Sequence, residues 1–597
     1  MKTLTPEERT VGKTNYYEAV GVSRRDFLKG VVAAGAVSGA GLGGLYFGYT
    51  KVTDPLRVGV IGTGDEGNVL LGAISPDYLQ VVAIADIRPY NIHRAFHGDT
   101  EILEVRCGLM KKYGWKTEDE ARKHVKVYDK DYHDLLKDPA VEAIIIALPL
   151  HLHAKVAIEA MKAGKHVLTE KLMGHNVAQC KVMGRVSEET GKILAVGHQR
   201  HYSVLYDNAV NLLRWGLLGQ LHHIRAQWHR GNLPGADSWQ QPLPGGEEAL
   251  VDGKKSKVDK IAKQLASYKR QLKEEKNSAN YTMLQKQIAQ WEAWMLDAKV
   301  DAAAHGYQEI KMKDGSTRSA LEELCRWRLW ARTGGGLMAE LGSHQLDAAS
   351  IFCTALRKDG KKAHPLSVHA VGGRHIFGLD RDAEDHVYCM FEFPGPEYDP
   401  SFDVGYKDPV LNIPDPKTGV PGYKDDHNKK IVVTYSSING NGYGGYGEVV
   451  MGTKGTLVLE REQEVMLYKT SDTSSLISVS KDKGGPTLST QASGPPSAAS
   501  AIARAADAGP VSRGYTEEME HWAWCIRNPA PENQPRCKPV VAMGDAIIAL
   551  TTNVAINKSL AGQPGFVQFQ EEWFDLKNDA TPDGSSVQKE YESLVKS

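Results

Sequence analysis

Two short segments of this chain carry side chains suited to redox chemistry on a bound nucleotide. A glycine-rich turn at 62–67 (Gly-Thr-Gly-Asp-Glu-Gly) follows an apolar run, and residues 164–171 (Gly-Lys-His-Val-Leu-Thr-Glu-Lys) end on Glu170 and Lys171. The turn alone predicts only that a phosphate is bound. A lysine at the end of a later strand adds a charged donor at the edge of the sheet where ligands of parallel sheets bind. Together the two segments predict a dehydrogenase.

The turn has the glycine spacing of a dinucleotide-binding fingerprint between a strand and a helix. Gly62 permits the tight turn, Gly64 lets a pyrophosphate approach the backbone, and Gly67 allows the helix to pack closely on the strand. The N-terminus of that helix would stabilise the phosphate charge. We therefore place Asp65 and Glu66, in the same turn, among the cofactor-binding residues.

Asp86, at the end of the second expected strand, bears on the choice of dinucleotide. A carboxylate at this place accepts hydrogen bonds from the adenosine ribose and repels a 2′-phosphate, which favours NAD. Arg88 lies close by, and its guanidinium could bind that phosphate. NADP therefore remains the alternative cofactor.

A third cluster, at 333–347, begins with Gly334-Gly335-Gly336 and carries Glu340, His344 and Asp347. Residues i and i+4 share one face of a helix, so Glu340 and His344 are expected to point together into a cleft. Asp347 is expected on that face, where it could orient the imidazole or contact the substrate. The pair could also ligate a metal, but no further ligands cluster with it, and we predict no metal site. For His344 alone, the alternative is a core histidine with satisfied hydrogen bonds.

Residues 147–153 (Ala-Leu-Pro-Leu-His-Leu-His) and 164–171 together resemble the Gfo/Idh/MocA family of sugar and polyol dehydrogenases, and the resemblance runs from Leu56 to about Phe574. It implies a Rossmann domain, an open-sheet domain and a catalytic Lys171 assisted by Glu340 and His344. It also implies that Glu170 contacts the nicotinamide-side ribose or orients the lysine, with Pro149 and His153 at the cofactor. The family's proline after the lysine is Leu172 here, so the sequence alone does not predict the family's cis or kinked peptide.

Candidate substrate-binding residues occur where strands of the second domain are expected to meet the cleft. Arg200 and Tyr202 lie in the segment that leads into that domain, and Trp228, Arg230 and Trp239 follow. Aromatic side chains that stack on sugar rings, beside an arginine that binds hydroxyl groups, suit a carbohydrate. Core packing is the alternative for each tryptophan.

The order of the apolar runs predicts an α/β protein of at least two domains, as the length of 597 residues requires. Short apolar runs alternate with amphipathic stretches over 55–197, the pattern of an NAD-binding Rossmann domain. Longer strands over 198–574 predict a C-terminal α/β domain for substrate binding and oligomerisation, with a large open, mostly antiparallel sheet. We expect a solvated helical insertion at 254–300, a flexible excursion at 471–509 and a C-terminal tail at 575–597.

The first fifty residues have the features of a twin-arginine export signal. Residues 23–29 (Ser-Arg-Arg-Asp-Phe-Leu-Lys) precede an uncharged, glycine-rich stretch. No clear cleavage site follows, so retention of the segment as a membrane anchor is the alternative to its removal. A periplasmic or membrane-anchored enzyme of this kind would hold its NAD tightly, because the export route carries folded proteins with cofactor loaded and free dinucleotide is scarce outside the cytoplasm.

Composition excludes other classes of function. The formal net charge is −1 with no basic stripe, which argues against a nucleic-acid partner. Seven dispersed cysteines argue against a disulfide framework and a zinc site. The leading hypothesis is hydride transfer between nicotinamide and a sugar or polyol hydroxyl carbon, in an enzyme that forms homo-oligomers through its open sheet. The alternatives are an NAD-dependent glycosidase using transient sugar oxidation, and a non-catalytic nucleotide-binding scaffold.

Overall fold

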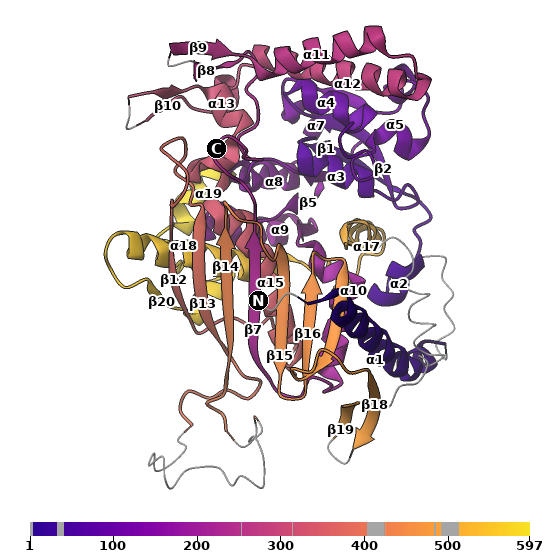
Figure 1. Cartoon of the computed structure of the whole chain (residues 1–597), viewed down its shortest axis with the longest axis vertical. Helices are drawn as coiled ribbons and strands as arrows, with labels where there is room; N and C mark the ends of the chain where they lie inside the picture. The colour runs from indigo at the N-terminus through magenta and orange to yellow at the C-terminus, as the bar shows by residue number, and fades with distance from the viewer. Residues whose placement is uncertain are drawn as a thin grey trace.

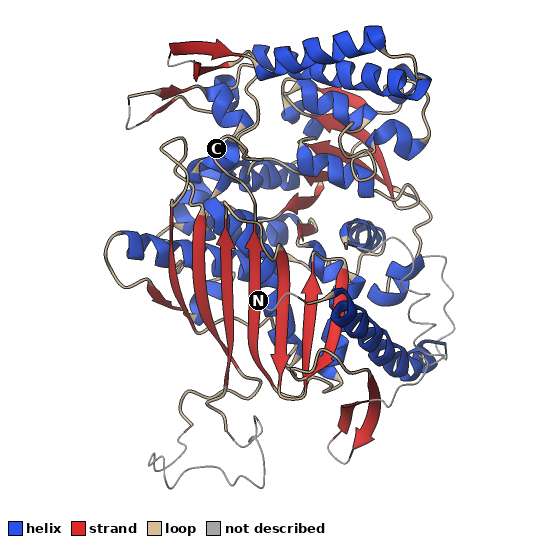
Figure 2. Ribbon diagram, in the orientation of Figure 1, coloured by secondary structure: helices blue, strands red, loops and turns tan. Residues whose placement is uncertain are grey.

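The computed structural model describes residues 4–32, 41–251, 254–312, 315–402, 423, 426–482, 485–490 and 513–596. Its described strands include a parallel sheet in the N-terminal half and a larger, mostly antiparallel sheet in the C-terminal half. The two lie one above the other in Figure 1, and in Figure 2 helices pack behind the large sheet while most of its near face is open. The expected fold class is therefore confirmed.

The N-terminal sheet has the strand order β3-β2-β1-β4-β5-β6, and every neighbouring pair is parallel. Its strands are β1 (Leu56–Ile61), β2 (Leu79–Ala85), β3 (Lys126–Tyr128), β4 (Ala143–Ile146), β5 (His166–Glu170) and β6 (Leu194–Gly197). Its helices include α3 (Asp65–Ala73), α4 (Pro89–His97), α5 (Gly108–Tyr113), α6 (Glu118–Ala121), α7 (Tyr132–Lys137), α8 (His153–Lys162) and α9 (Val177–Thr190). The strand order reverses between β1 and β4, which opens a crevice at their carboxyl ends.

The C-terminal sheet has the order β17-β16-β15-β7-β14-β13-β12-β20, in which only the pair of β7 and β14 is parallel. Its strands are β7 (Leu221–His229), β12 (Ser367–Gly373), β13 (His386–Pro394), β14 (Lys430–Ile438), β15 (Tyr446–Gly452), β16 (Gly455–Glu460), β17 (Glu464–Lys469) and β20 (Phe566–Gln568). The helices include α10 (Val204–Arg214), α13 (Ala320–Cys325), α15 (Ser343–Ala355), α17 (Tyr515–Arg527), α18 (Pro539–Leu560) and α19 (Val587–Val595). Side chains alternate between buried and exposed along β13, as in a sheet with one covered face.

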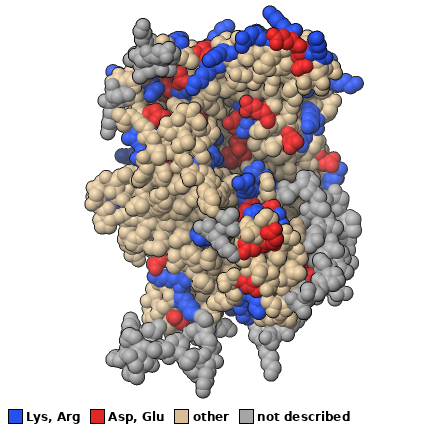
Figure 3. Space-filling view, viewed as in Figure 1, with Lys and Arg blue, Asp and Glu red and all other residues tan. Residues whose placement is uncertain are grey.

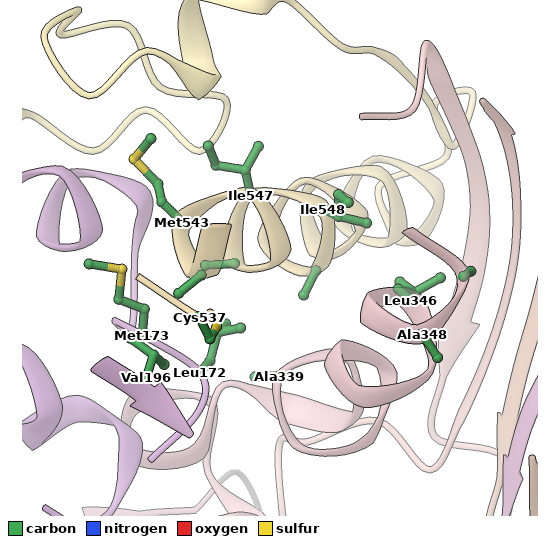
Figure 4. Close-up of a cluster of buried hydrophobic side chains, with 14 of the residues drawn as sticks. Leu172, Met173, Val196, Ala339, Leu346, Ala348, Cys537, Met543, Ile547 and Ile548 are labelled. Carbon is green, nitrogen blue, oxygen red and sulfur yellow. The ribbon is translucent and has the colours of Figure 1, made fainter. Parts of the chain in front are cut away.

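Buried apolar side chains fasten the two domains to each other around α18 (Figure 4). Leu172 and Val196 come from the Rossmann domain, Ala339 and Leu346 from the second domain, and Met543 from α18, and all are at most 2% exposed. Burying one large apolar side chain stabilises a fold by about 1.5–3 kcal/mol. This shared core therefore fixes the residues on either side of it, which include Lys171 and Glu340.

Among the described residues, α18 is the one helix long and apolar enough to cross a membrane. However, 72% of its most apolar window is buried inside the structure, as in the core helix of a globular domain.

The expected helical insertion is a two-helix arm that packs on the Rossmann domain. A hairpin of β8 (Glu247–Val251) and β9 (Lys254–Val258) leads into α11 (Lys260–Glu274) and α12 (Ser278–Leu296). The arm lies beside α4 in Figure 1, where the Trp294 ring of α12 stacks on Tyr90 with centroids 4.5 Å apart. The outer faces of both helices are solvated, and α11 exposes several basic residues: Lys260, Lys263, Lys269, Arg270 and Lys273. Lys and Arg atoms mark the upper edge of the molecule in Figure 3.

The N-terminal segment packs on the last strands of the large sheet. The helix α1 (Pro6–Val32), whose range includes Arg24 and Arg25, lies beside the β17 edge (Figure 1). Arg9 and Lys13 both form ion pairs with Glu464 of β17. The Tyr468 hydroxyl donates to the Glu8 carbonyl at 2.9 Å. The part of the expected signal that precedes the twin arginines is therefore docked on the folded protein.

Residues 477–482 and 485–490 correct the expectation of a flexible excursion. They form a hairpin of β18 (Ile477–Asp482) and β19 (Gly485–Thr490). Asn15 of α1 accepts a hydrogen bond from the Ile477 backbone at 2.9 Å and donates to the Ser475 carbonyl at 3.1 Å. The serine- and proline-rich composition did not reveal this partner, because α1 lies far away in the sequence. The remainder of the expected excursion, from residue 491, lies outside the described residues.

A substitution on α1 tests whether the N-terminal segment is docked. Alanine usually stabilises a helix by about 1 kcal/mol relative to glycine. A Cβ on Gly12, however, would overlap the Tyr468 ring and lie 2.7 Å from the Met466 Cβ. We therefore expect Gly12→Ala to lower stability by about 1–3 kcal/mol, as overpacking does. Differential scanning fluorimetry measures this as a lower melting temperature. Gly231→Ala, where a Cβ meets nothing within 4 Å, is the matched control; an unchanged melting temperature in Gly12→Ala would contradict the docking.

Candidate functional site

A cavity of about 990 Å³ lies where the carboxyl ends of the parallel strands face the second domain. Its walls come from both domains and from the loop that follows the helical arm. Most of the residues expected from the sequence line it: Gly62, Gly64, Asp65, Glu66, Asp86, Arg88, Pro149, Glu170, Lys171, Trp228, Arg230, Glu340 and His344. The structure therefore brings the three chemical clusters of the sequence into one space.

The glycine-rich turn at the cavity wall has room for a dinucleotide phosphate. Gly62 has a φ of +88°, and a Cβ on Gly67 would overlap the Gly62 carbonyl, so both positions require glycine. A Cβ on Gly64 would point toward open space, with its nearest atom at 3.8 Å. No side chain caps the N-terminus of α3 at Gly64. This uncapped helix N-terminus beside a bare glycine fits a bound pyrophosphate.

Two carboxylates beside that turn differ in their partners. Asp65 forms an ion pair with Arg94 at 2.8 Å. Burial alone would raise the pKa of Asp65, but the positive charges of Arg94 and Arg106 outweigh this effect and lower the pKa below its usual value. Burial raises the pKa of Glu66, and the charge of Glu66 in turn raises the pKa of Glu170. Asp65 therefore stays ionised inside an arginine clamp, whereas burial makes Glu66 harder to ionise.

Glu170 ends β5 at the centre of the cavity and is 6% exposed. Its Oε2 accepts a hydrogen bond from the Lys171 backbone nitrogen at 3.1 Å. Burial, and then the neighbouring Glu66, raises the pKa of Glu170 well above its ordinary value. A carboxyl group that keeps its proton can donate a hydrogen bond to a ligand hydroxyl or amide.

Asp86 and Arg88 occupy the end of the cavity beyond β2. Asp86 Oδ2 accepts hydrogen bonds from the Thr63 backbone nitrogen at 2.8 Å and from Asn91 at 3.1 Å. Arg88 Nε donates to Asp297 Oδ2 at 2.8 Å. The arginine that could have bound a 2′-phosphate is thus already paired with an acidic residue of the helical arm.

Lys171 and Glu340 meet across the domain boundary. Lys171 Nζ donates to the main-chain oxygen of Glu340 at 2.7 Å, and the Glu340 carboxylate accepts from Arg328 Nε at 2.6 Å. Glu340 belongs to a π-helical turn, η6 (Met338–Gly342), a feature that recurs at functional sites. Burial opposes ionisation of Glu340, but Arg328 and Lys171 outweigh it and lower its pKa to about 2. The peptide bond between Lys171 and Leu172 is cis.

His344 lies one residue into α15, directly after the π-helical turn. Its ring centroid is 5.5 Å from that of Trp228. Burial, followed by the positive charge of Lys171, lowers the pKa of His344 well below its ordinary value. The imidazole is therefore neutral at neutral pH and has a nitrogen available to accept a proton.

Aromatic and basic side chains form the wall beside His344. The Arg230 guanidinium lies 5.6 Å from the ring centroids of both Trp228 and Trp239. Trp228 also stacks on Tyr446, with centroids 4.3 Å apart. This wall combines flat apolar surfaces with hydrogen-bond donors, as a ligand rich in hydroxyl groups requires.

His153, expected at the cofactor, lies behind the cavity wall. Its Nδ1 and Nε2 contact the carbonyl oxygens of Leu172 and Leu148, each at 2.8 Å. It therefore connects the two loops that carry Lys171 and Pro149.

Arg200 and Tyr202 lie outside the cavity lining, because each side chain is buried against other parts of the chain. Arg200 pairs with Glu462 at 2.7 Å and lies under Trp228, 6.0 Å from its centroid. The Tyr202 hydroxyl contacts His521 at 2.8 Å and accepts from the Arg536 backbone at 2.7 Å. Neither side chain is placed to contact a ligand in the cavity directly.

Asp347 also points away from the cavity, into a buried polar cluster. It contacts His201 at 2.9 Å and Lys362 at 2.9 Å, and Lys362 reaches Asp545 at 2.5 Å. His198, Asp347 and Asp545 are close enough to hold a metal ion, but the Lys362 ammonium already supplies a positive charge between the two carboxylates. Asp347 therefore does not orient His344 by a hydrogen bond, as the shared helical face had suggested.

Several cavity residues were not found from the sequence. Arg328 lies a few residues before the glycine cluster in the chain, and that proximity was a signal for it. Arg513 and Tyr515, at the start of α17, had no signal, because only folding brings them beside Glu66. The same holds for Arg94 and Arg106, which clamp Asp65.

Comparison with known proteins found similarity over the first domain. Residues 56–198 match the model of the GFO_IDH_MocA family, described as "Oxidoreductase family, NAD-binding Rossmann fold". A "Glycosyl hydrolase family 109 protein" of Solibacter usitatus is 28% identical over 222 residues, 35% of this chain and 46% of that protein. An "Inositol 2-dehydrogenase" of Salmonella typhimurium is 28% identical over 168 residues, 28% of this chain and 43% of that protein. The chain thus spans less than half the length of these curated relatives.

Among solved structures, a levoglucosan dehydrogenase in complex with NADH has a TM-score of 0.46 and 16% identity, covering 87% of this chain and 100% of the other. The family match supports an NAD-binding Rossmann domain of this oxidoreductase family at residues 56–198.

A buried carboxyl group behind the cavity makes stability depend on pH. Glu448 is 1% exposed and accepts from the Tyr206 hydroxyl at 2.8 Å. Burial, only partly offset by Arg200, raises its pKa from 4.5 to about 7. Glu448 therefore takes up a proton when the protein folds at a pH between these two values. The stability that this protonation contributes is fully present below the pKa of the group in the unfolded chain, and it is lost as the pH rises through about 7.

Glu448→Gln cannot ionise, so we expect its melting temperature to fall less than that of the wild type between pH 5 and about 8. The free energies of unfolding of the two proteins should diverge by up to about 1.4 kcal/mol per pH unit. The exposed Glu532→Gln is the control and should follow the wild type. Parallel pH profiles for Glu448→Gln and the wild type would refute the raised pKa.

Proposed function

We propose that this chain is an NAD-dependent oxidoreductase of the Gfo/Idh/MocA family that acts on a hydroxyl-bearing carbon of a sugar or polyol. The observation that carries the proposal is the meeting of Lys171, Glu340 and His344 in the cavity that also contains the glycine-rich turn. NAD, when bound there, supplies the nicotinamide that accepts or returns a hydride. The protein residues supply orientation and proton transfer.

His344 acts as the general base in this proposal. Its neutral imidazole accepts the proton of the substrate hydroxyl as the hydride leaves the same carbon. Burial and the charge of Lys171 keep the imidazole neutral before reaction. In the reverse direction the protonated His344 returns the proton to the carbonyl oxygen.

Lys171 stabilises the charge that develops on the reacting oxygen. Its Nζ has one donor fixed on the Glu340 carbonyl, which leaves the other two N–H groups for substrate. The Glu340 carboxylate is a positioning group, since Arg328 holds it ionised at one edge of the π-helical turn. Lys171 is therefore held at the Glu340 carbonyl, in the cavity that His344 also lines, before substrate arrives.

The wall formed by Trp228, Arg230 and Trp239 supports a sugar or polyol as the substrate class. Tryptophan rings stack on the apolar faces of sugars, and the arginine between them donates hydrogen bonds to hydroxyl groups. The relative named as an inositol 2-dehydrogenase points to the same chemical class.

NAD is the proposed cofactor, and tight retention is part of the proposal. Asp86 lies where a ribose diol would be bound, while Glu170 and Pro149 lie along the opposite part of the cavity. His305 and Tyr307, from the loop after the helical arm, also line the cavity and would cover a bound dinucleotide.

Export through the twin-arginine machinery and assembly into homo-oligomers belong to the proposal as well. Residues 23–29 support export to the periplasm, or retention at the membrane. Val371, Tyr388 and Met390, between 44% and 52% exposed on β12 and β13, support contact with a second copy through the open sheet.

Replacing Lys171 by alanine tests the proposed catalytic role. We expect the rate of NADH formation with the best substrate of a sugar and polyol panel to fall about 10²–10⁴-fold, as for the loss of a catalytic proton or charge donor. NAD affinity, measured by isothermal titration calorimetry, should change little. Lys155→Ala, at an exposed position of the cavity rim, is the matched control and should keep its activity. An unchanged rate in Lys171→Ala would overturn the assignment.

An NAD-dependent glycosidase is the second candidate, favoured by the relative named as a family 109 glycosyl hydrolase. Transient oxidation of the sugar would allow elimination of the aglycone, with the hydride returned at the end. Assays with nitrophenyl glycosides distinguish the two functions: released nitrophenol without net NADH supports the glycosidase, and net NADH without nitrophenol supports the dehydrogenase. Neither product from any substrate would favour a nucleotide-binding scaffold.

A further inference from the structure

We propose that the helical arm (α11 and α12, with Asp297 directly after α12) selects the dinucleotide, because Asp297 holds Arg88 and makes the adenosine end of the cavity accept NAD and reject NADP. The inference rests on the proposed function and assigns a specificity role to a residue of the inserted arm.

Asp297 is completely buried and is bonded to two residues near the end of β2. Its Oδ2 accepts from Arg88 Nε at 2.8 Å, and its Oδ1 accepts from the Tyr90 backbone nitrogen at 3.0 Å. Arg88 lines the cavity together with Asp86. The arm therefore reaches the part of the cavity where the adenosine ribose is expected.

The position of Asp297 is fixed by the packing of α12 on α4. The ring of Trp294 stacks on Tyr90 at an interplanar angle of 11°. Gln290, one turn earlier, accepts from the Thr100 backbone nitrogen at 2.9 Å. The carboxylate is thus held by a packed helix end, and α12 lies against α4 along this contact in Figure 1.

The charges at this end of the cavity favour a neutral ribose. Asp86 and Asp297 carry two negative charges against the one positive charge of Arg88. A 2′-phosphate would add about −1.5 to −2 to this group, whereas the ribose diol of NAD adds none. An unpaired arginine would offer its forked donors to that phosphate. Asp297 both occupies Arg88 Nε and cancels its charge.

Arg88 retains the means to bind a phosphate if Asp297 is removed. Within the described residues its buried Nη2 has no hydrogen-bond partner. Without the Asp297 charge, Asp86 and Arg88 would sum to zero, and the guanidinium would be available to an incoming phosphate. The selection therefore depends on one carboxylate that lies more than two hundred residues away in the sequence.

The test compares the binding of NAD and NADP to the full chain by isothermal titration calorimetry. In Asp297→Asn we expect the ratio of the NADP dissociation constant to the NAD dissociation constant to fall about tenfold or more, equivalent to about 1.4 kcal/mol. Glu292→Gln removes the same charge from the exposed side of α12, where Glu292 pairs with Lys269 at 2.7 Å. This control should keep the wild-type ratio.

Two further variants keep the test decisive. Adding Arg88→Gln to Asp297→Asn should abolish the gained NADP affinity, because the gain comes through that guanidinium. Arg88→Gln alone should leave the already weak NADP binding unchanged, and it provides the result if Asp297→Asn does not fold. Circular dichroism and melting temperature report folding in each variant.

Three results would overturn the inference: a wild type that prefers NADP, an unchanged ratio in folded Asp297→Asn, or a loss of NADP binding in Arg88→Gln alone. A wild type that binds neither dinucleotide would overturn the proposed function instead, so the two failures are distinguishable.

Discussion

The candidate site depends on one hydrogen bond between the domains, from the Lys171 ammonium to the Glu340 carbonyl. Lys171 extends a strand of the parallel sheet, whereas Glu340 belongs to a helical turn packed on the other sheet. Each has a buried apolar neighbour in the shared core, Leu172 on one side and Ala339 on the other. Because the core around α18 holds both neighbours, the domains cannot shift relative to each other without separating the lysine from His344.

Charge pairing explains how so many ionisable groups share one cavity. Arg328 neutralises Glu340, and Arg94 neutralises Asp65, each at hydrogen-bonding distance. In the groups left without such a partner the pKa shifts toward the neutral form instead: the pKa of Glu170 is raised and that of His344 is lowered. Buried charges persist in proteins when they are paired, and otherwise their pKa shifts toward the neutral form. The neutral base beside a cationic donor follows directly from this division.

The sequence predicted the parts of the fold and site that depend on local pattern. Apolar runs located most strands, and the glycine spacing located the turn that lines the cavity. Glu340 and His344 both line the cavity, although Glu340 lies in a π-helical turn and not in the α-helix that the i, i+4 spacing assumed. The same spacing misplaced Asp347, whose side chain is taken by Lys362 from a different element. Tyr202, Asp297 and Arg88 show the same limit: their partners come from distant segments, and no periodicity within one helix or strand encodes such a partner.

Because α1 docks on β17, the N-terminal helix can reach its native contacts only after a strand that lies much later in the chain has formed. Glu464 and Tyr468 contact Arg9 and Glu8 across 455 and 460 positions of the sequence. During synthesis α1 therefore lacks these native contacts until β17, more than four hundred residues later in the chain, has been made. Contacts between residues so far apart in the sequence form late and slowly during folding. Tyr16 of the same helix is 1% exposed in the folded protein, so its solvent exposure would mark chains in which α1 has not docked.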